Sequence, residues 1–143
     1  MGLSSKTRLR VRYADTDQMG FVYHANYLVW FEVGRAEFFR ELDLPYKKFE
    51  EQGLRLTVIE ASCRYRKPAR YDDEIIIETE IEHLSFHAVR FCYHVYREET
   101  LLAEGKTVHV FINTDGRLAN VRQYPIWTFL HTIFEKNKNK NSV

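Results

Sequence analysis

The sequence has 143 residues, of which 45% are hydrophobic and 15% aromatic, and this composition predicts a single domain with its own core and excludes a disordered or collagen-like chain. Lys and Arg number 21 against 20 for Asp and Glu, and the formal net charge of +1 provides no overall field to attract nucleic acid or an anionic membrane. Neither cysteine lies in a C-x-x-C pair, and no apolar run approaches the roughly 18 residues of a membrane span. We expect a cytoplasmic protein with no nucleic-acid partner and no integral membrane association.

The first half of the chain predicts a strand, a loop and a long helix. Residues 6–13 alternate apolar side chains with arginines, which is the pattern of a half-buried strand, and residues 14–25 lose all periodicity. Bulky apolar side chains then recur at spacings of three and four over residues 26–42. We expect a sheet to wrap this helix. Pro45 ends it, and residues 46–52 predict a short second helix.

The second half of the chain changes to the period of two that is typical of strands. Strands are predicted over residues 54–66, 74–82, 88–97 and 101–113, with a short one near 118–121 after the Asp115-Gly116 turn. A final helix is predicted to begin at Pro125. This order predicts one α+β domain over residues 1–135, followed by a flexible basic tail over 136–143. One helix cannot cover both faces of such a sheet, so we expect a second subunit.

Several common kinds of site are excluded by the sequence. It contains no G-x-S-x-G, no Walker A run and no G-x-G-x-x-G, so a serine hydrolase of that type and a nucleotide cofactor are not expected. His83 and His87 are four residues apart, but a turn is predicted between them, so the spacing does not indicate a helical metal site. The mid-strand histidines His94 and His109 are interpreted as satisfied interior or interface groups.

The loop before the long helix carries the strongest chemical signal. Asp15, Asp17 and Gly20 lie within a few residues of the predicted helix start. A helix N-terminus exposes backbone N–H groups that can stabilise a developing oxyanion. A carboxylate a few residues upstream can attack a carbonyl that is held there, or activate water beside it.

The chain resembles the hotdog-fold acyl-CoA thioesterases of the 4-hydroxybenzoyl-CoA thioesterase family in these residues. The similar runs are Asp15-Thr16-Asp17 followed by Gly20, Val22-Tyr23-His24-Ala25-Asn26-Tyr27, and Phe31-Glu32-x-x-Arg35-x-Glu37. The resemblance is greatest to the bacterial subgroup associated with the Tol-Pal genes. It extends through Tyr65-x-x-Pro68-Ala69 to about residue 121.

The resemblance implies an antiparallel sheet of five or six strands wrapped around the long helix, and a homodimer or homotetramer. It implies that Asp17 is the catalytic carboxylate, as nucleophile or as general base, and that the backbone N–H of His24 polarises the thioester carbonyl. Residues Thr57, Val58 and Ile59 would form the wall of the acyl pocket across the dimer interface. The reaction would release a free acid and CoA without a metal or other cofactor.

Other roles for the loop residues stay open at this point. Asn26 either contacts the loop and the substrate or caps the helix, and Asp15 is expected to hydrogen-bond the loop in an Asx-type turn. A hotdog hydratase or dehydratase would use a histidine general base, for which His24 is the candidate. A non-enzymatic module that binds an acyl group or single-stranded nucleic acid is a third class, because basic residues over 64–70 accompany many aromatic side chains.

The contacts to CoA cannot be assigned by position. Where the aromatic-specific member of the family has a basic cluster for the CoA phosphates, this chain has Ser85-Phe86-His87. Other basic side chains that could supply this charge are Arg64, Arg66, Lys67, Arg70 and Arg90. The sequence also leaves open the acyl group and the choice between CoA and acyl carrier protein.

Overall fold

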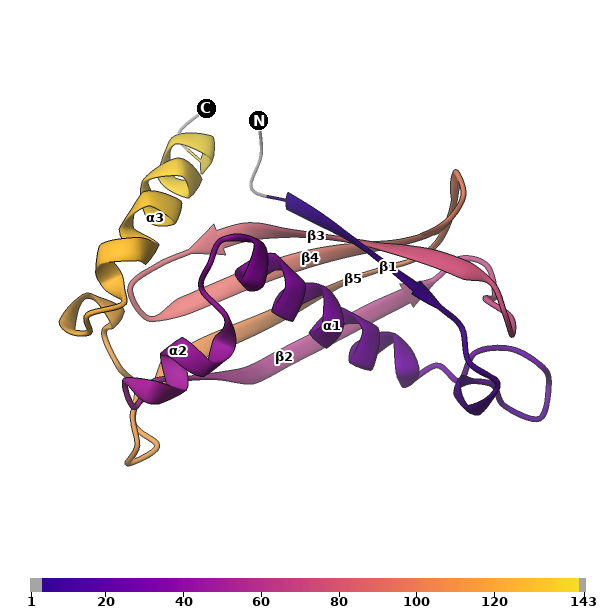
Figure 1. The fold of residues 1–143 in the computed structure, drawn as a ribbon, viewed down its shortest axis with the longest axis horizontal. Coiled ribbons are helices and arrows are strands. Elements are labelled where there is room, and N and C mark those ends of the chain that lie inside the picture. Colours follow the sequence, from indigo (N-terminus) through magenta and orange to yellow (C-terminus); the bar gives the residue numbers. More distant parts are fainter. Residues whose placement is uncertain (1–3, 142–143) are drawn as a thin grey trace.

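The computed structural model describes residues 4–141, in which five antiparallel strands form one sheet around a long helix (Figure 1). The strands are β1 (Ser4–Arg10), β2 (Arg55–Tyr65), β3 (Glu74–Leu84), β4 (Ala88–Arg97) and β5 (Thr100–Ile112). The helices are α1 (Asn26–Glu41), α2 (Tyr46–Glu51) and α3 (Trp127–Asn141), with short 3-10 helices η1 (Tyr13–Asp15) and η2 (Val121–Gln123). The strand order is β1-β3-β4-β5-β2. The predicted α+β class and the hotdog arrangement are confirmed.

The central strands show why this sequence forms a sheet with one covered face. In β4 the side chains of Val89, Phe91, Tyr93 and Val95 are all buried, while the residues between them are partly or fully exposed. β3 alternates in the same way, with isoleucines inside and glutamates outside. A period of two places every second side chain on the same face, so the apolar residues of both strands meet the helix.

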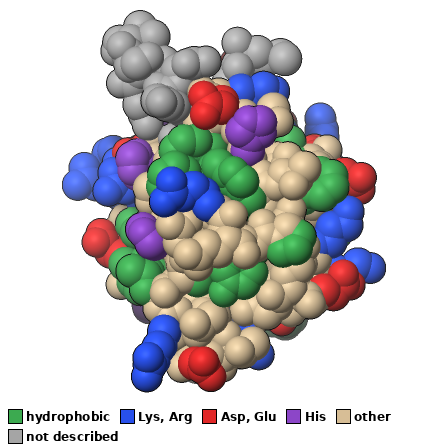
Figure 2. All heavy atoms as spheres, turned by 90° about the vertical axis from the view of Figure 1, so that its left-hand side faces the viewer, with side chains coloured by type: hydrophobic (Ala, Val, Ile, Leu, Met, Phe, Trp, Pro, Cys, Tyr) green, Lys and Arg blue, Asp and Glu red, His purple; other side chains and the backbone are tan. Residues whose placement is uncertain are grey.

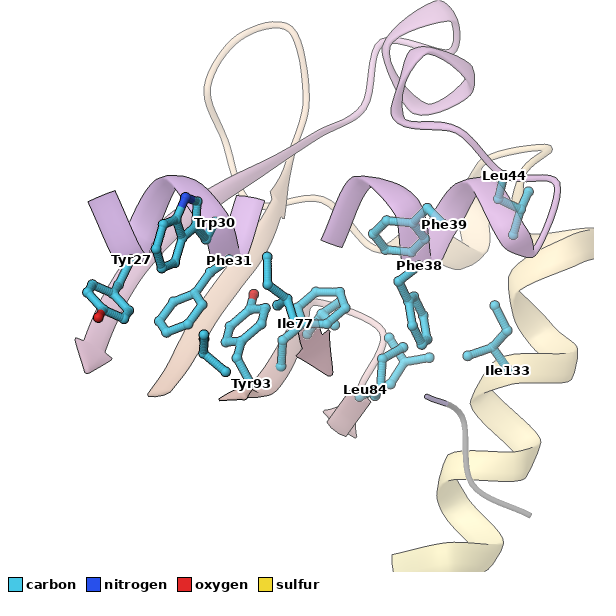
Figure 3. Packing of buried hydrophobic residues seen from close by; sticks show 14 of the residues in the cluster. Tyr27, Trp30, Phe31, Phe38, Phe39, Leu44, Ile77, Leu84, Tyr93 and Ile133 are labelled. Carbon is cyan, nitrogen blue, oxygen red and sulfur yellow. The ribbon is translucent and has the colours of Figure 1, made fainter. Parts of the chain in front are cut away.

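The core lies between α1 and the inner face of the sheet (Figure 3). Five aromatic side chains of α1 are buried: Tyr27, Trp30, Phe31, Phe38 and Phe39. The ring of Phe31 stacks on the ring of Tyr93, with 4.2 Å between the ring centroids. Burial of each large aromatic ring stabilises the fold by about 1.5–3 kcal/mol, so this face of α1 holds the helix across the sheet.

Two glycines allow the helix and the sheet to approach closely. A Cβ atom added to Gly105 on β5 would lie 2.5 Å from the Phe31 ring and 2.5 Å from the carbonyl oxygen of Ser62. A Cβ atom on Gly34 of α1 would collide with the Thr79 hydroxyl of β3. The distance between α1 and the sheet is therefore set at positions that have no side chain.

The sheet ends in two edge strands, β1 and β2, and β2 is the more exposed of the two. Within the described residues β2 pairs with β5 on one side only, and most of its side chains are exposed. The register shifts between Val58 and Glu60, where a bulge interrupts the ladder. Val58 and Ile59 are 46% and 61% exposed. An apolar segment thus lies on an unpaired edge.

The C-terminal region differs from the prediction in two ways. The prediction of a strand near 118–121 is wrong. Leu118 forms only an isolated bridge with Ile112, and the 3-10 helix η2 follows. β4 pairs with β5 only as far as Val110, so there is room for Leu118 and Ala119 beside the end of β5 but not for a longer strand. The boundary predicted at residue 135 falls inside α3, which continues to Asn141, and residues 142–143 lie outside the described range.

The end of the molecule at which α3 lies is shown in Figure 2. Lys and Arg side chains are interspersed with Asp and Glu around the rim of this face, in keeping with the nearly balanced charge of the chain. None of the helices within residues 4–141 is both long and apolar enough to cross a membrane.

Candidate active site

Asp17 lies at the start of a tight turn between η1 and α1. Its backbone N–H donates to the carbonyl of Phe21 at 2.8 Å, and Gly20 closes the turn with a φ of 84° that favours glycine. Oδ1 of Asp17 accepts hydrogen bonds from the N–H of Met19 at 2.8 Å and of Phe21 at 3.3 Å. The backbone of the turn therefore orients the carboxylate, which is half-buried.

Asp15 is held in a different way, although it is only two residues away. It is 4% exposed, and its two carboxylate oxygens accept from the backbone N–H of Arg12 at 2.9 Å and from the Arg12 guanidinium at 2.9 Å. Burial is the largest influence on the pKa of Asp15 and acts to raise it, but the hydrogen bonds and charge of Arg12 together hold the pKa below its ordinary value. Asp15 thus bonds back to Arg12, the N-cap residue of η1, and does not form the Asx-type turn that was predicted.

Asn26 anchors the base of the loop. Its Nδ2 donates to the carbonyl oxygen of Asp15 at 2.8 Å, and the N–H of Tyr23 donates to the same oxygen at 2.8 Å. The N-cap position of α1 is Ala25, which makes no side-chain capping bond. Of the two open roles, the structure therefore shows that Asn26 orients the loop and does not cap the helix.

The backbone N–H of His24 points away from the first turn of α1. The carbonyl of Tyr23 accepts from the N–H of Asn26 at 2.9 Å, along the helix direction. Because a trans peptide is planar and its C=O and N–H point in opposite directions, the N–H of the Tyr23–His24 peptide faces outward from the helix start. None of the described residues accepts a backbone hydrogen bond from it. It is a free donor at the positive end of the helix dipole.

Asp17 and His24 line the same groove. Its volume is about 520 Å³, and its walls include Tyr27, Tyr65 and Pro68. The predicted catalytic carboxylate and the predicted carbonyl-binding residue thus come together at one surface, next to the start of α1. The two residues are seven positions apart, and the segment between them is also fastened to Ala69 and Arg70 by backbone pairing.

Tyr65 is a member of this groove that the sequence did not single out. Its hydroxyl donates to the carbonyl of His24 at 2.8 Å, and its ring packs edge-on against Tyr27 at 5.0 Å between centroids. Burial, with a smaller effect of Cys63, raises the pKa of Tyr65 to about 12, so the hydroxyl remains a donor at neutral pH. The only signal in the sequence was its place in the Tyr65-x-x-Pro68 run, since Tyr65 and His24 are 41 residues apart.

The other predicted substrate contacts do not line this groove. Exposed positions on the outer edge of β2 hold Thr57, Val58 and Ile59. The side chain of Asn26 is hydrogen-bonded to the carbonyl oxygen of Asp15 in the loop. Within one chain, residues 57–59 therefore do not contact the Asp17 site.

Basic side chains lie at one side of the groove. Arg66 and Lys67 belong to its walls, and Arg66 also pairs with Glu104 at 3.2 Å. Arg70 lies over the ring of Phe21 at 4.9 Å, and Arg90 pairs with Glu82 at 3.7 Å. Of the five basic candidates, Arg66 and Lys67 are those placed at the groove.

The Ser85-Phe86-His87 turn has its own structural contacts. The Ser85 hydroxyl accepts from the N–H of Ala88 at 3.1 Å, and the His87 ring contacts the carbonyl of Ala119 through Nδ1 at 3.1 Å. These bonds close the β3–β4 turn and fasten the segment before η2.

An antiparallel five-stranded sheet wrapped around one long helix is the architecture of the hotdog thioesterases. The chain belongs to the Thioesterase-like superfamily, whose family model matches residues 11–136. This confirms the family resemblance and the expected acyl-CoA thioesterase class.

Individual relatives agree with the family match. The chain is 35% identical to the Bacillus subtilis protein YneP over 137 residues, which are 94% of this chain and 97% of YneP. It is 37% identical to "Acyl-CoA thioesterase YbgC" of Haemophilus influenzae over 79% of this chain and 83% of the relative. Among solved structures, the DHNA-CoA thioesterase of Staphylococcus aureus superposes with a TM-score of 0.88 at 28% identity, covering 98% of this chain and 96% of that one.

Proposed function

We propose that the groove between the Asp17 turn and the start of α1 hydrolyses acyl-CoA thioesters, with Asp17 as the catalytic residue. The observation that carries this proposal is that Asp17 and the unpartnered N–H of His24 lie on one groove. The thioester carbonyl would accept a hydrogen bond from the N–H of His24. Negative charge that develops on the carbonyl oxygen would be stabilised by this donor and by the helix dipole.

The carboxylate of Asp17 has one oxygen available for the reaction. Two backbone N–H groups occupy Oδ1, which leaves Oδ2 to attack the carbonyl carbon or to accept a proton from water. In the first route a mixed anhydride forms as the CoA thiolate leaves, and water then cleaves the anhydride. In the second route water adds directly while Asp17 takes its proton. Both routes yield the free acid, the CoA thiol and a regenerated carboxylate.

The two routes differ in where an oxygen atom from water ends. We would run a single turnover in ¹⁸O-labelled water with enzyme in excess over acyl-CoA. The nucleophilic route places label in the peptide that contains Asp17 when water attacks its carbonyl in the anhydride. The general-base route places label in the acid product alone.

The basic side chains at the groove support CoA as the carrier. Arg66 and Lys67 are exposed on its wall, where they could bind phosphate oxygens of CoA. An acyl carrier protein presents the same thioester on a phosphopantetheine arm and is the alternative carrier. Cys63 and Cys92 form no disulfide in the described part of the chain, which suits the reducing cytoplasm in which we place this enzyme.

We further propose that the active enzyme is a homodimer or homotetramer in which β2 meets a partner. The open edge of β2 and the exposed side chains of Val58 and Ile59 support this assembly. Residues Thr57, Val58 and Ile59 would then contribute to the partner's acyl pocket, which explains why they do not line the groove of their own chain.

A panel of acyl-CoA substrates with a thiol-detecting assay tests the function. We expect thiol release from at least one straight-chain or aromatic acyl-CoA, and none above background from the Asp17→Asn variant. A protein that releases no thiol from any member of the panel, or whose Asp17→Asn variant is as active as the parent, would contradict the proposal.

A further inference from the structure

The end of strand β2 lies beside both halves of the Asp17 groove. β2 ends at Tyr65, at the end of the molecule where α1 begins (Figure 1). The backbone that follows is fixed on β5, because the N–H groups of Arg66 and Lys67 both donate to the carbonyl of Leu102, at 2.8 and 3.1 Å. Leu102 is fully buried. The end of β2 is therefore a firm support for the loop that it contacts.

The carboxylate half of the groove is tied to this support by main-chain hydrogen bonds. The N–H of Val22 donates to the carbonyl of Ala69 at 2.9 Å. Phe21 pairs with Arg70 in an antiparallel bridge, and its carbonyl accepts from the N–H of Asp17 at 2.8 Å. The turn that carries the carboxylate thus has a fixed position relative to the end of β2.

The half of the groove at the start of α1 is tied to the same support by a side chain. The hydroxyl of Tyr65 donates to the carbonyl of His24 at 2.8 Å. The same carbonyl also accepts from the N–H of Tyr27, but at 3.4 Å, which is outside the usual range of about 2.7–3.2 Å. The ring of Tyr65 packs edge-on against the buried ring of Tyr27, which supports the hydroxyl in this position. The bond from Tyr65 is therefore the closer of the two.

The two peptide groups that meet at the Cα of His24 are both held. The Tyr23–His24 peptide, which carries the free N–H, is held at its carbonyl by the N–H of Asn26 at 2.9 Å. The His24–Ala25 peptide is held at its carbonyl by Tyr65. Peptide groups are planar, so only φ and ψ can rotate between them. Holding both planes therefore restricts the direction of the N–H of His24.

We propose that Tyr65 is a positioning residue for thioester hydrolysis: through its bond to the carbonyl of His24, its hydroxyl keeps the N–H of His24 directed at the developing oxyanion. This inference rests on the role proposed above for that N–H. Donors that are already oriented stabilise a developing charge without reorganisation during the reaction. Loss of the Tyr65 hydroxyl should therefore lower kcat, with little change in KM.

The first measurement compares Tyr65→Phe with Tyr71→Phe. Tyr65→Phe removes the hydroxyl and keeps the ring, so we expect kcat to fall about threefold to tenfold, as for one neutral hydrogen bond, and KM to stay within about twofold. Tyr71 is also exposed and lies close in sequence, but it does not line the groove, so Tyr71→Phe should change neither constant. An unchanged kcat in Tyr65→Phe, or a rise in KM alone, would overturn the proposal.

A double variant distinguishes action through His24 from direct contact between Tyr65 and the substrate. In His24→Pro the N–H is absent, so the hydroxyl of Tyr65 has no donor to orient. Tyr65→Phe should then cause no further loss of kcat in that background. A full additional loss in the double variant would show that Tyr65 acts on the substrate directly, and the positioning role would be wrong.

The second measurement needs neither hydrolysis nor the proline variant. Backbone ¹⁵N-labelled histidine gives an amide signal for His24, which is identified by its disappearance in His24→Ala. The probes are ketone analogues of the acyl-CoA panel, with CH₂ in place of the thioester sulfur, and CoA thioethers with CH₂ in place of the carbonyl. The ketone should move the His24 amide proton downfield further than the thioether does. This difference should be smaller in Tyr65→Phe than in the parent and in Tyr71→Phe.

The two measurements separate this inference from the proposed function. If hydrolysis depends on Asp17 but Tyr65→Phe equals the parent in kcat and in amide shift, the function stands and the positioning role is wrong. If no thioester is hydrolysed but the ketone moves the His24 amide less in Tyr65→Phe than in the parent, the positioning role stands and the proposed function fails. If the ketone does not move the His24 amide of the parent, this N–H is not the carbonyl donor and the inference fails, even where Asp17 is needed for hydrolysis.

Discussion

Asp15 and Asp17 are two residues apart, and their surroundings predict opposite consequences of the same substitution. In Asp17→Asn the amide retains the shape of the side chain but can neither attack a carbonyl nor take a proton. We expect hydrolysis to fall by about 10²- to 10⁴-fold while urea unfolding stays close to that of the parent. Thiol release and an unfolding curve on the same preparation measure both quantities.

Asp15→Asn is the matched comparison. It removes the charged hydrogen bonds to Arg12, so we expect it to lower the free energy of unfolding by about 1–3 kcal/mol and to reduce activity less than Asp17→Asn. The pKa of Asp15 is lowered by folding, so its contribution to stability is present above the unfolded pKa near 3.8 and is lost as the pH falls through the lower folded value. The reverse ranking of the two activities would assign the catalytic role to Asp15.

His24 is expected to act through its backbone rather than its ring. His24→Ala retains the N–H and should keep substantial activity, whereas His24→Pro removes the donor and should lower kcat by about 10²- to 10³-fold. Circular dichroism confirms that each variant is folded. A folded but inactive alanine variant would show that the imidazole does the chemistry, as in the hydratase alternative.

At the scale of elements, the packing of α1 on β5 depends on the missing side chain of Gly105. In Gly105→Ala the new methyl group would meet the Phe31 ring on one side and the backbone oxygen of Ser62 on the other, and the backbone cannot give way easily. We expect a loss of about 1–3 kcal/mol in the free energy of unfolding, as for other overpacked cores. Urea denaturation measures it, and a variant as stable as the parent would show that α1 has room to move.

The elements were predictable where a single period dominates the sequence. Strands β3 and β4 place an apolar residue at nearly every second position, and α1 repeats its aromatics at helical spacing, so their bounds were predicted within a few residues. The sequence around residue 118 is compatible with a strand, although the structure has none there. Its absence depends on where β4 ends, which is a property of the neighbouring strand.

Only those residues of the candidate site that are close together in the sequence could be predicted. Asp17 and His24 are only seven positions apart, so their sequence spacing already placed them near each other, and both line the groove. Tyr65 reaches His24 from β2, across 41 residues of sequence. Contacts of this kind depend on strand register and on side-chain direction, which the pattern of a single segment does not contain.

At the scale of the whole molecule, the open edge of β2 predicts the assembly. Ile59→Lys places a charge on an exposed position of that edge, so it should leave the fold of one chain intact but prevent pairing with a second copy. We expect a smaller species in sedimentation velocity and a loss of activity if residues 57–59 complete the partner's site. Leu118→Lys, at a position 60% exposed and outside β2, is the control.

Sedimentation and activity together distinguish a role of β2 in assembly from a role in catalysis. A parent protein that is an active 17 kDa monomer at micromolar concentration would refute the dimer proposal. A monomeric Ile59→Lys variant with full activity would show that the groove of a single chain is sufficient.

The exposed edge of β2 also bears on how this chain avoids aggregation. The outer edge of the eleven-residue strand β2 pairs with no other described strand, so it is a template on which another extended chain could add a strand. The bulge before Glu60 twists this edge, and Arg55, Glu60 and Arg64 place charges along it. These features disfavour indiscriminate strand addition and still permit a partner whose own charges and bulge match.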